Sequence, residues 1–146
     1  MTAYQTLSDI EEIKKLKARY CRFVDTRNWL GLRGLFTDDA RSTLGGEDQS
    51  ADEFVSLARE WLGESTSVHS VCMPEIEIAD PGTASGVWGM EDIVTFPSNP
   101  GEAPKGIHGW GHYQEEYRKV DNRWLIHRMA LHRLRLDPLE GGFPDA

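Results

Sequence analysis

The second half of the chain constrains the fold most strongly, because long stretches of it alternate between apolar and polar residues. Between residues 86 and 96 every even position is apolar except Asp92. Successive strand residues point to opposite faces of a sheet, so this period predicts a long strand with one buried face. Burying an unpaired carboxylate is costly, so Asp92 must be paired, protonated or in a wet pocket.

Three further strands follow from the same pattern. A hairpin turn is expected at Asp121 and Asn122, because these residue types accept the left-handed backbone of a tight turn. Another turn is expected at the segment ADPGT. The four predicted strands cover residues 66–78, 83–97, 107–120 and 124–136.

The first half of the chain predicts three helices. Ser8, with a glutamate three residues later, forms a capping-box pattern, and an apolar stripe at helical spacing follows as far as Val24. A second helix is expected to hold residues 29–36 and to end at TDDA. A third helix begins at Ser50, again with a glutamate three residues later, and closes at Gly63.

Helices followed by a meander of long strands predict an α+β fold, with three N-terminal helices on one face of an antiparallel sheet. Several glycines lie inside the predicted strands, where glycine often marks a bulge or a sharp bend. A sheet bent strongly around the first helix would enclose a conical pocket.

Composition narrows the classes of function. The 146 residues suit one domain, and the net charge of −8 argues against a nucleic-acid partner. No apolar run is long enough to span a membrane, and no signal peptide is expected at the N-terminus. Two cysteines without metal-ligand spacing fit free thiols in a reducing cytoplasm.

Four polar residues are candidates for chemistry. His69 has apolar neighbours, and histidine is a residue type suited to proton transfer near neutral pH, although a histidine in such a place is often a satisfied core residue. Tyr20 lies in the centre of the apolar stripe, either as core or as a donor to a substrate oxygen. Asp92 forms either a structural ion pair or part of a pocket. Helical periodicity directs Asp25 roughly 140° away from Tyr20, toward solvent.

The last predicted strand offers a partner for Asp92, because Arg128 falls on its apolar face. His108 and His112 are four residues apart without an obvious third ligand, so no metal site is expected. The side chains expected to line an apolar pocket are Trp88, Met90, Phe96, Trp110 and His112.

Three segments carry a resemblance to a known family. RYCRFVDTRNWLGLRGLFTDDA, HSVCMPEIEIAD and GHYQEEYRKVDNRWLIHRMALHRLR together resemble a SnoaL-like domain of the nuclear-transport-factor-2-like superfamily. The resemblance covers residues 7–137 as a single domain and leaves an irregular tail at 138–146. It implies three helices and a strongly curved sheet that form a cone with an apolar pocket.

Within that superfamily the pattern is most similar to lyases of the bile-acid 7α-dehydratase and scytalone dehydratase type. The former has a tyrosine, an aspartate five residues later, a histidine on the first long strand and an aspartate on the next. Tyr20, Asp25, His69 and Asp92 match that order.

The resemblance also implies an aspartate–histidine pair, which would be Asp25 and His69, and a pocket arginine, either Arg128 or Arg133. In the family the aspartate follows a turn at the helix end, which would direct it into the pocket. The ketosteroid isomerases are a contrast, because the position of their base corresponds to Leu44 here.

These implications predict a dehydratase that needs no cofactor and performs β-elimination on an apolar, ring-shaped, hydroxylated substrate. The alternatives are a non-catalytic module that binds a small molecule, and a polyketide cyclase or isomerase. Hydrogen-bond contact between Asp25 and His69 inside a pocket would favour an enzyme. Apolar residues on both faces of the long strands also predict a homodimer or homotrimer.

Overall fold

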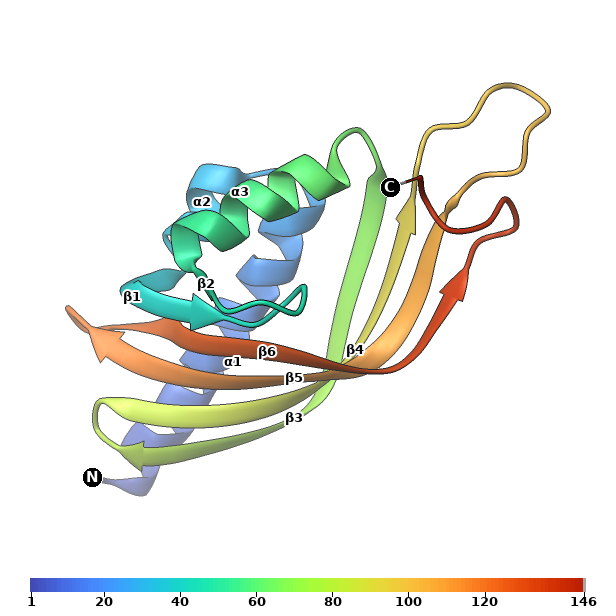
Figure 1. Ribbon diagram of the computed structural model, residues 1–146. Coiled ribbons are helices and arrows are strands. Elements are labelled where there is room, and N and C mark those ends of the chain that lie inside the picture. The colour runs from blue at the N-terminus through green and yellow to red at the C-terminus, as the bar shows by residue number, and fades with distance from the viewer. Residues whose placement is uncertain (146) are drawn as a thin grey trace.

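The computed structural model describes residues 1–145 and places three helices on one side of a strongly curved sheet (Figure 1). The sheet has six strands, and the α+β architecture agrees with the prediction. The elements in chain order are α1 (Ala3–Asp25), α2 (Trp29–Arg33), β1 (Phe36–Ser42), β2 (Gln49–Ser50), α3 (Ala51–Leu62), β3 (Thr66–Asp80), β4 (Thr83–Thr95), β5 (Gly106–Val120) and β6 (Arg123–Pro138).

Helix α1 begins earlier than the sequence predicted. Thr2 is the N-cap, and its hydroxyl accepts a hydrogen bond from the Gln5 backbone N–H at 3.0 Å. The expected cap at Ser8 therefore lies inside the helix and was wrong. The helix ends at Asp25, where Thr26 caps it and Arg27 adopts a left-handed φ of 61°.

The second predicted helix is only partly correct. Asn28 caps α2, but the helix stops at Arg33, and Phe36 begins strand β1. This strand lies parallel to β6, and the Ile126 N–H donates to the Leu35 carbonyl at 2.8 Å. Phe36 therefore pairs with the edge of the sheet at β6, although its apolar spacing alone indicated a helix.

Helix α3 follows the prediction closely. The Ser50 hydroxyl accepts from the Glu53 N–H at 3.2 Å, and the Glu53 carboxylate accepts from the Ser50 N–H at 3.1 Å. This reciprocal pair is a capping box, and it satisfies two N–H groups that the helix leaves free. Gly63 caps the other end with a positive φ of 49°.

The four long strands form a meander, and the order across the sheet is β2-β1-β6-β5-β4-β3. Asp121 and Asn122 both have positive φ, as the predicted two-residue turn between β5 and β6 requires. Strand β6 carries an extra residue, His127, because Tyr117 pairs with Ile126 while Glu116 pairs with Arg128. A bulge of this kind shifts the side chains that follow it to the opposite face. A second extra residue, Leu134, reverses the alternation again, because Gly111 pairs with Arg133 while Trp110 pairs with Arg135.

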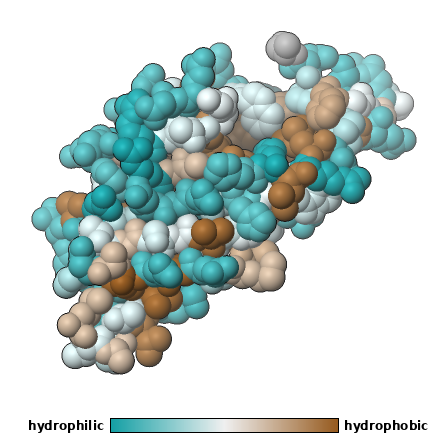
Figure 2. Space-filling view, turned by 60° about the horizontal axis from the view of Figure 1, so that its bottom comes forward, coloured by the Kyte–Doolittle hydropathy of each residue, from teal (hydrophilic) through white to brown (hydrophobic). Residues whose placement is uncertain are grey.

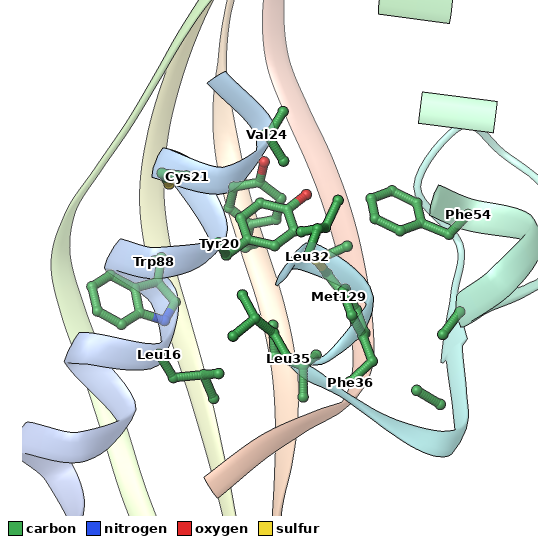
Figure 3. Packing of buried hydrophobic residues seen from close by; sticks show 14 of the residues in the cluster. Leu16, Tyr20, Cys21, Val24, Leu32, Leu35, Phe36, Phe54, Trp88 and Met129 are labelled. Carbon is green, nitrogen blue, oxygen red and sulfur yellow. The ribbon is translucent and has the colours of Figure 1, made fainter. Parts of the chain in front are cut away.

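The core lies between α1 and the concave face of the sheet. Figure 3 shows Leu16, Tyr20 and Val24 of α1 packed close to Leu32 and Met129. Tyr20, Phe36 and Phe54 form an aromatic cluster with centroid distances of 5.7 to 6.5 Å. This packing fixes α1 against the sheet and thereby positions the end of the helix.

The capping box makes Ser50 a test of how α3 is held. Ser50→Ala removes the acceptor for the Glu53 N–H, so the free energy of unfolding should fall by about 1 kcal/mol. Ser56→Ala, at an exposed position within the same helix, should change it by less than about 0.5 kcal/mol. Urea denaturation of both variants measures the difference, and equal stabilities would contradict the role given to the cap.

Candidate functional site

The carboxylate of Asp25 contacts strand β3 because α1 ends at this residue. One oxygen, Oδ1, lies 2.7 Å from His69 Nδ1, and the other, Oδ2, accepts a hydrogen bond from the His69 backbone N–H at 2.7 Å. The left-handed backbone at Arg27 turns the chain just after the helix. Helical periodicity directed Asp25 away from the apolar stripe of α1, and strand β3 occupies that side of the helix end, where Ser67 and the His69 N–H bind the carboxylate.

Ser67 and Arg27 surround the same carboxylate, and sequence reasoning missed both. The Ser67 hydroxyl donates to Asp25 Oδ1 at 2.9 Å and accepts from Arg27 Nη1 at 2.7 Å. Arg27 Nη1 also donates to the Val24 carbonyl at 2.8 Å. Strand alternation places Ser67 on the same face as His69, so its position was available from the sequence.

His69 is oriented by its contact with Asp25. A carboxylate accepts hydrogen bonds, so Nδ1 carries the proton in the neutral ring and Nε2 has a free lone pair. Nε2 lies 3.8 Å from Asp92 Oδ2. The His69 side chain is 12% exposed, so the imidazole is mostly buried and keeps a small contact with solvent. The arrangement presents a fixed base atom beside a buried carboxylate.

Asp92 is paired, which explains why a carboxylate points to the apolar face of β4. Arg133 Nη1 and Nη2 donate to its two oxygens, each at 2.9 Å. The Asp92 side chain is 4% exposed and that of Arg133 is 29% exposed, so the guanidinium extends from the buried carboxylate toward solvent. Hydrogen bonding to Asp92 raises the pKa of Arg133, which therefore keeps its charge.

Gly109 provides the space for this ion pair. It faces Asp92 across the β4–β5 ladder. A Cβ atom at Gly109 would overlap Arg133 Nη1 and would lie 2.5 Å from Asp92 Oδ1, far inside contact distance. Any larger residue at this position would therefore displace the arginine or the carboxylate.

Arg128 does not contact Asp92, so the choice of Arg128 as the partner of Asp92 was wrong. The bulge at His127 turns Arg128 to the outer face of the sheet, where it pairs with Glu116 at 3.2 Å. Its side chain is 62% exposed. The bulge makes Arg133, the alternative arginine, the one that faces inward.

Tyr20 is buried near this cluster, and its hydroxyl points toward the end of α1 that carries Val24 (Figure 3). Its ring meets that of Tyr113 edge to face, with centroids 5.8 Å apart. Burial raises the pKa of Tyr20 and of Tyr113, and the negative charge of Asp92 adds to both effects. Both phenols therefore stay protonated and act as hydrogen-bond donors. Tyr113 was not singled out from the sequence.

The five residues predicted to line the pocket separate into two groups. Trp88 and Met90 are buried on the inner face, and Phe96 meets Trp61 edge to face at 5.6 Å. Trp110 and His112 lie on the outer face, contrary to the prediction. The reason is register: Gly109 faces Asp92, so Trp110 shares the exposed face with Glu91.

Two surface hollows lie away from these side chains. One, of about 510 Å³, lies beside Arg41, Glu75 and Arg128, and the other, of about 760 Å³, lies between α1 and the β5–β6 turn. Neither is lined by His69 or Asp92. These hollows therefore do not mark the candidate site, which is identified by the contacts among its polar side chains.

Within residues 1–145 no group of three or more His, Cys, Asp or Glu side chains is arranged to hold a metal ion. No helix in that part of the chain is long and apolar enough to cross a membrane. The cluster of Asp25, His69, Asp92 and Arg133 offers a base, an anion that stabilises its protonated form, and a cation that can bind a developing negative charge.

Known proteins resemble this chain in both sequence and fold. A relative named probable cyclase FGR4, from Gibberella zeae, is 24% identical over 137 residues, covering 84% of this chain and 89% of that protein. The hexachlorocyclohexane dehydrochlorinase LinA-type3 from Novosphingobium barchaimii LL02 superimposes with a TM-score of 0.80 at 17% identity, over 99% of each chain. A candidate scytalone dehydratase from Novosphingobium aromaticivorans gives a TM-score of 0.83 at 16% identity, over 98% of this chain and 97% of the other.

The structural likenesses, at these low identities, show a shared fold. The sequence itself carries the stronger finding, because the family model described as a SnoaL-like domain matches residues 5–130, which is most of the chain. The chain therefore belongs to the SnoaL-like domain family.

Proposed function

We propose that this protein is a lyase that needs no cofactor and eliminates water from an apolar, ring-shaped, hydroxylated substrate. The observation that carries the proposal is the 2.7 Å contact between Asp25 and His69, with Nε2 of the imidazole left free beside the Asp92–Arg133 pair. A catalytic base requires a fixed tautomer and a ring nitrogen without a hydrogen-bonded partner, and this imidazole has both. A non-catalytic binding module would not need a base oriented in this way.

The first step of the proposed reaction breaks a C–H bond. His69 Nε2 takes a proton from the carbon beside a carbonyl or conjugated ring, and the electron pair of that bond moves toward the substrate oxygen. Asp25 stabilises the imidazolium that forms, because its negative charge is hydrogen-bonded to Nδ1. The Arg133 guanidinium and the Tyr20 hydroxyl would bind the enolate-like oxygen.

The second step breaks the C–O bond to the leaving hydroxyl. The electron pair of the enolate forms the new C=C bond, and the hydroxyl leaves as water with the proton that His69 had taken. Asp92 would hold Arg133 and accept a hydrogen bond from the substrate. The proton taken by His69 leaves with the water, so the enzyme returns to its starting protonation state. Elimination of water changes no net oxidation state, so the cycle requires no redox partner.

The names of similar proteins support this class of reaction. Dehydrochlorination and dehydration are both eliminations, and proteins named for them share this fold. The relative named as a cyclase favours a second candidate function, in which the same base starts ring closure. The inner residues Trp88, Met90 and Phe96 favour an apolar ring in either case.

Removing the base tests the proposal directly. A screen of hydroxylated cyclic ketones, steroids and naphthols first identifies a substrate. His69→Ala should then lower kcat by about 10²–10⁴, the usual contribution of a positioned general base. Asp25→Asn should also slow the reaction without unfolding the protein, because it removes the negative partner of the imidazolium.

The matched control is His132→Ala, since His132 is exposed on the outer face of the sheet. It should leave turnover unchanged. Thermal melts of each variant separate lost activity from lost fold. Full activity per folded molecule in His69→Ala would exclude the mechanism as stated.

The outer face of the sheet supports a further proposal, a homodimer or homotrimer formed through it. The helices leave this face uncovered, and hydrophobic groups interrupt its polar surface (Figures 1 and 2). Val68 is 55% exposed there, next to the partly buried Ile93. We expect light scattering to give the mass of two or three chains at micromolar concentration.

Ile93→Lys should shift that mass toward one chain, because a charge on an apolar contact face costs desolvation energy. Leu30→Lys is the control, since Leu30 is 88% exposed on the helical side. A wild-type protein that is monomeric at micromolar concentration would contradict this assembly.

A further inference from the structure

Lys17 is buried completely, although neither the proposed base nor the proposed substrate anchors use it directly. Its Nζ lies 2.6 Å from Glu115 Oε2, and both side chains are 0% exposed. Removing two charges from water is expensive, and such a pair is commonly neutral or unfavourable compared with apolar residues of the same volume. Stability alone is therefore a weak explanation for this pair.

The ammonium of Lys17 lies against two tyrosine rings. Its Nζ is 3.8 Å from the ring centroid of Tyr20 and 3.5 Å from that of Tyr113. An ammonium has three N–H bonds, so one carboxylate and two ring faces provide a partner for each of them. The cation therefore holds two rings from α1 and β5 in a fixed relation.

Glu115 is held at both of its oxygens. Oε2 accepts from Lys17, and Oε1 accepts from the Tyr117 hydroxyl at 2.7 Å. The Tyr117 oxygen accepts in turn from Trp88 Nε1 at 2.9 Å. The buried chain thus runs from an inner-face tryptophan, through the ion pair, to the ring of Tyr20.

A cation against the face of a phenol stabilises negative charge on that ring and its oxygen. The hydroxyl consequently becomes a stronger hydrogen-bond donor. Tyr113 lies two residues beyond Gly111, the register partner of Arg133, on the same face of β5, and Tyr20 meets Tyr113 edge to face. Burial, with a smaller contribution from Asp92, raises the pKa of both phenols, so both rings belong to the surroundings of the candidate site.

We propose that Lys17 is a positioning residue, which holds Tyr20 and Tyr113 and strengthens their hydroxyls as donors toward a substrate oxygen. This inference rests on the proposed function for the role of Tyr20 as a donor. In this proposal the buried ion pair acts on the site. Glu115 keeps the Lys17 ammonium charged in an apolar core, and the ammonium polarises the phenols of Tyr20 and Tyr113.

The test measures the acidity of the phenol at position 20 without any substrate. Replacing Tyr20 by 3,5-difluorotyrosine lowers the intrinsic pKa of the phenol, so that it can be titrated by absorbance in the folded protein. The titration compares the native Lys17–Glu115 pair, which holds the charged ammonium, with Lys17→Met/Glu115→Gln, which has a neutral pair. Loss of the cation should raise the pKa of the fluorinated phenol by about one unit or more.

The direction of the change separates polarisation from packing. A merely structural role would let water enter when Lys17 is replaced, and water would lower the pKa of a buried phenol. An unchanged or lowered pKa in the double variant would therefore overturn the proposal. Difluorotyrosine at Tyr4, which is 81% exposed, is the control and should titrate equally in both backgrounds.

A second neutral pair provides a measurement if the first double variant does not fold. Lys17→Gln/Glu115→Gln retains a hydrogen bond between the two positions and should raise the phenol pKa in the same direction. Lys17→Arg with native Glu115 keeps the charge and should leave the phenol close to its wild-type value, and a rise there equal to that of the neutral pairs would overturn the proposal. Because the titration does not involve His69, failure of the elimination mechanism and failure of this inference give different results.

Discussion

The Asp25 carboxylate joins the end of α1 to strand β3, and the geometry of the site depends on this junction. Its two oxygens receive hydrogen bonds from the Ser67 hydroxyl, the His69 backbone and the His69 ring. Strand β3 is an edge of the sheet with a neighbour on one side only, so a tie to the buried helix α1 limits its movement. The interaction that secures the edge strand also fixes the direction of the imidazole.

Local patterns predicted the parts of the fold in which the strand period is unbroken. Along β4 every side chain alternates as expected, so the inward direction of Trp88, Met90 and Asp92 could be read from the sequence. The β6 prediction failed because the extra residue at His127 reverses the alternation, which exchanges Arg128 for Arg133. Nothing in the residue types around His127 identifies a bulge.

Two other misplacements have the same kind of cause. Trp110 has the composition of a pocket residue, but its face is set by pairing with Glu91 on the neighbouring strand, a long-range property. Phe36 has helical spacing, but a free sheet edge beside β6 provides backbone partners that a short helix cannot match. For Asp25 the error lay in the local pattern, because helical periodicity directed the side chain toward solvent. The resemblance to the family correctly placed it next to His69.

The inner face of the sheet combines two ion pairs with an aromatic core. Asp92–Arg133 lies beside the imidazole, and Lys17–Glu115 lies beneath the tyrosine rings. Asp92 and Arg133 form two parallel hydrogen bonds, while Lys17 also contacts two rings and Glu115 also accepts from Tyr117, so each charge has a matched partner as low-dielectric surroundings require. We interpret this interior as one arrangement, in which fixed charges act on the space beside His69 Nε2.

The ring protonation of His69 tests that interpretation most directly. Nitrogen-15 NMR of the five histidines, with the His69 signals assigned from His69→Ala, reports which ring nitrogen carries the proton. The account predicts a proton on Nδ1, shared with Asp25, and an unprotonated Nε2 in the neutral ring at slightly alkaline pH. A neutral ring with its proton on Nε2 and a bare Nδ1 would contradict the oriented base on which the proposed elimination depends.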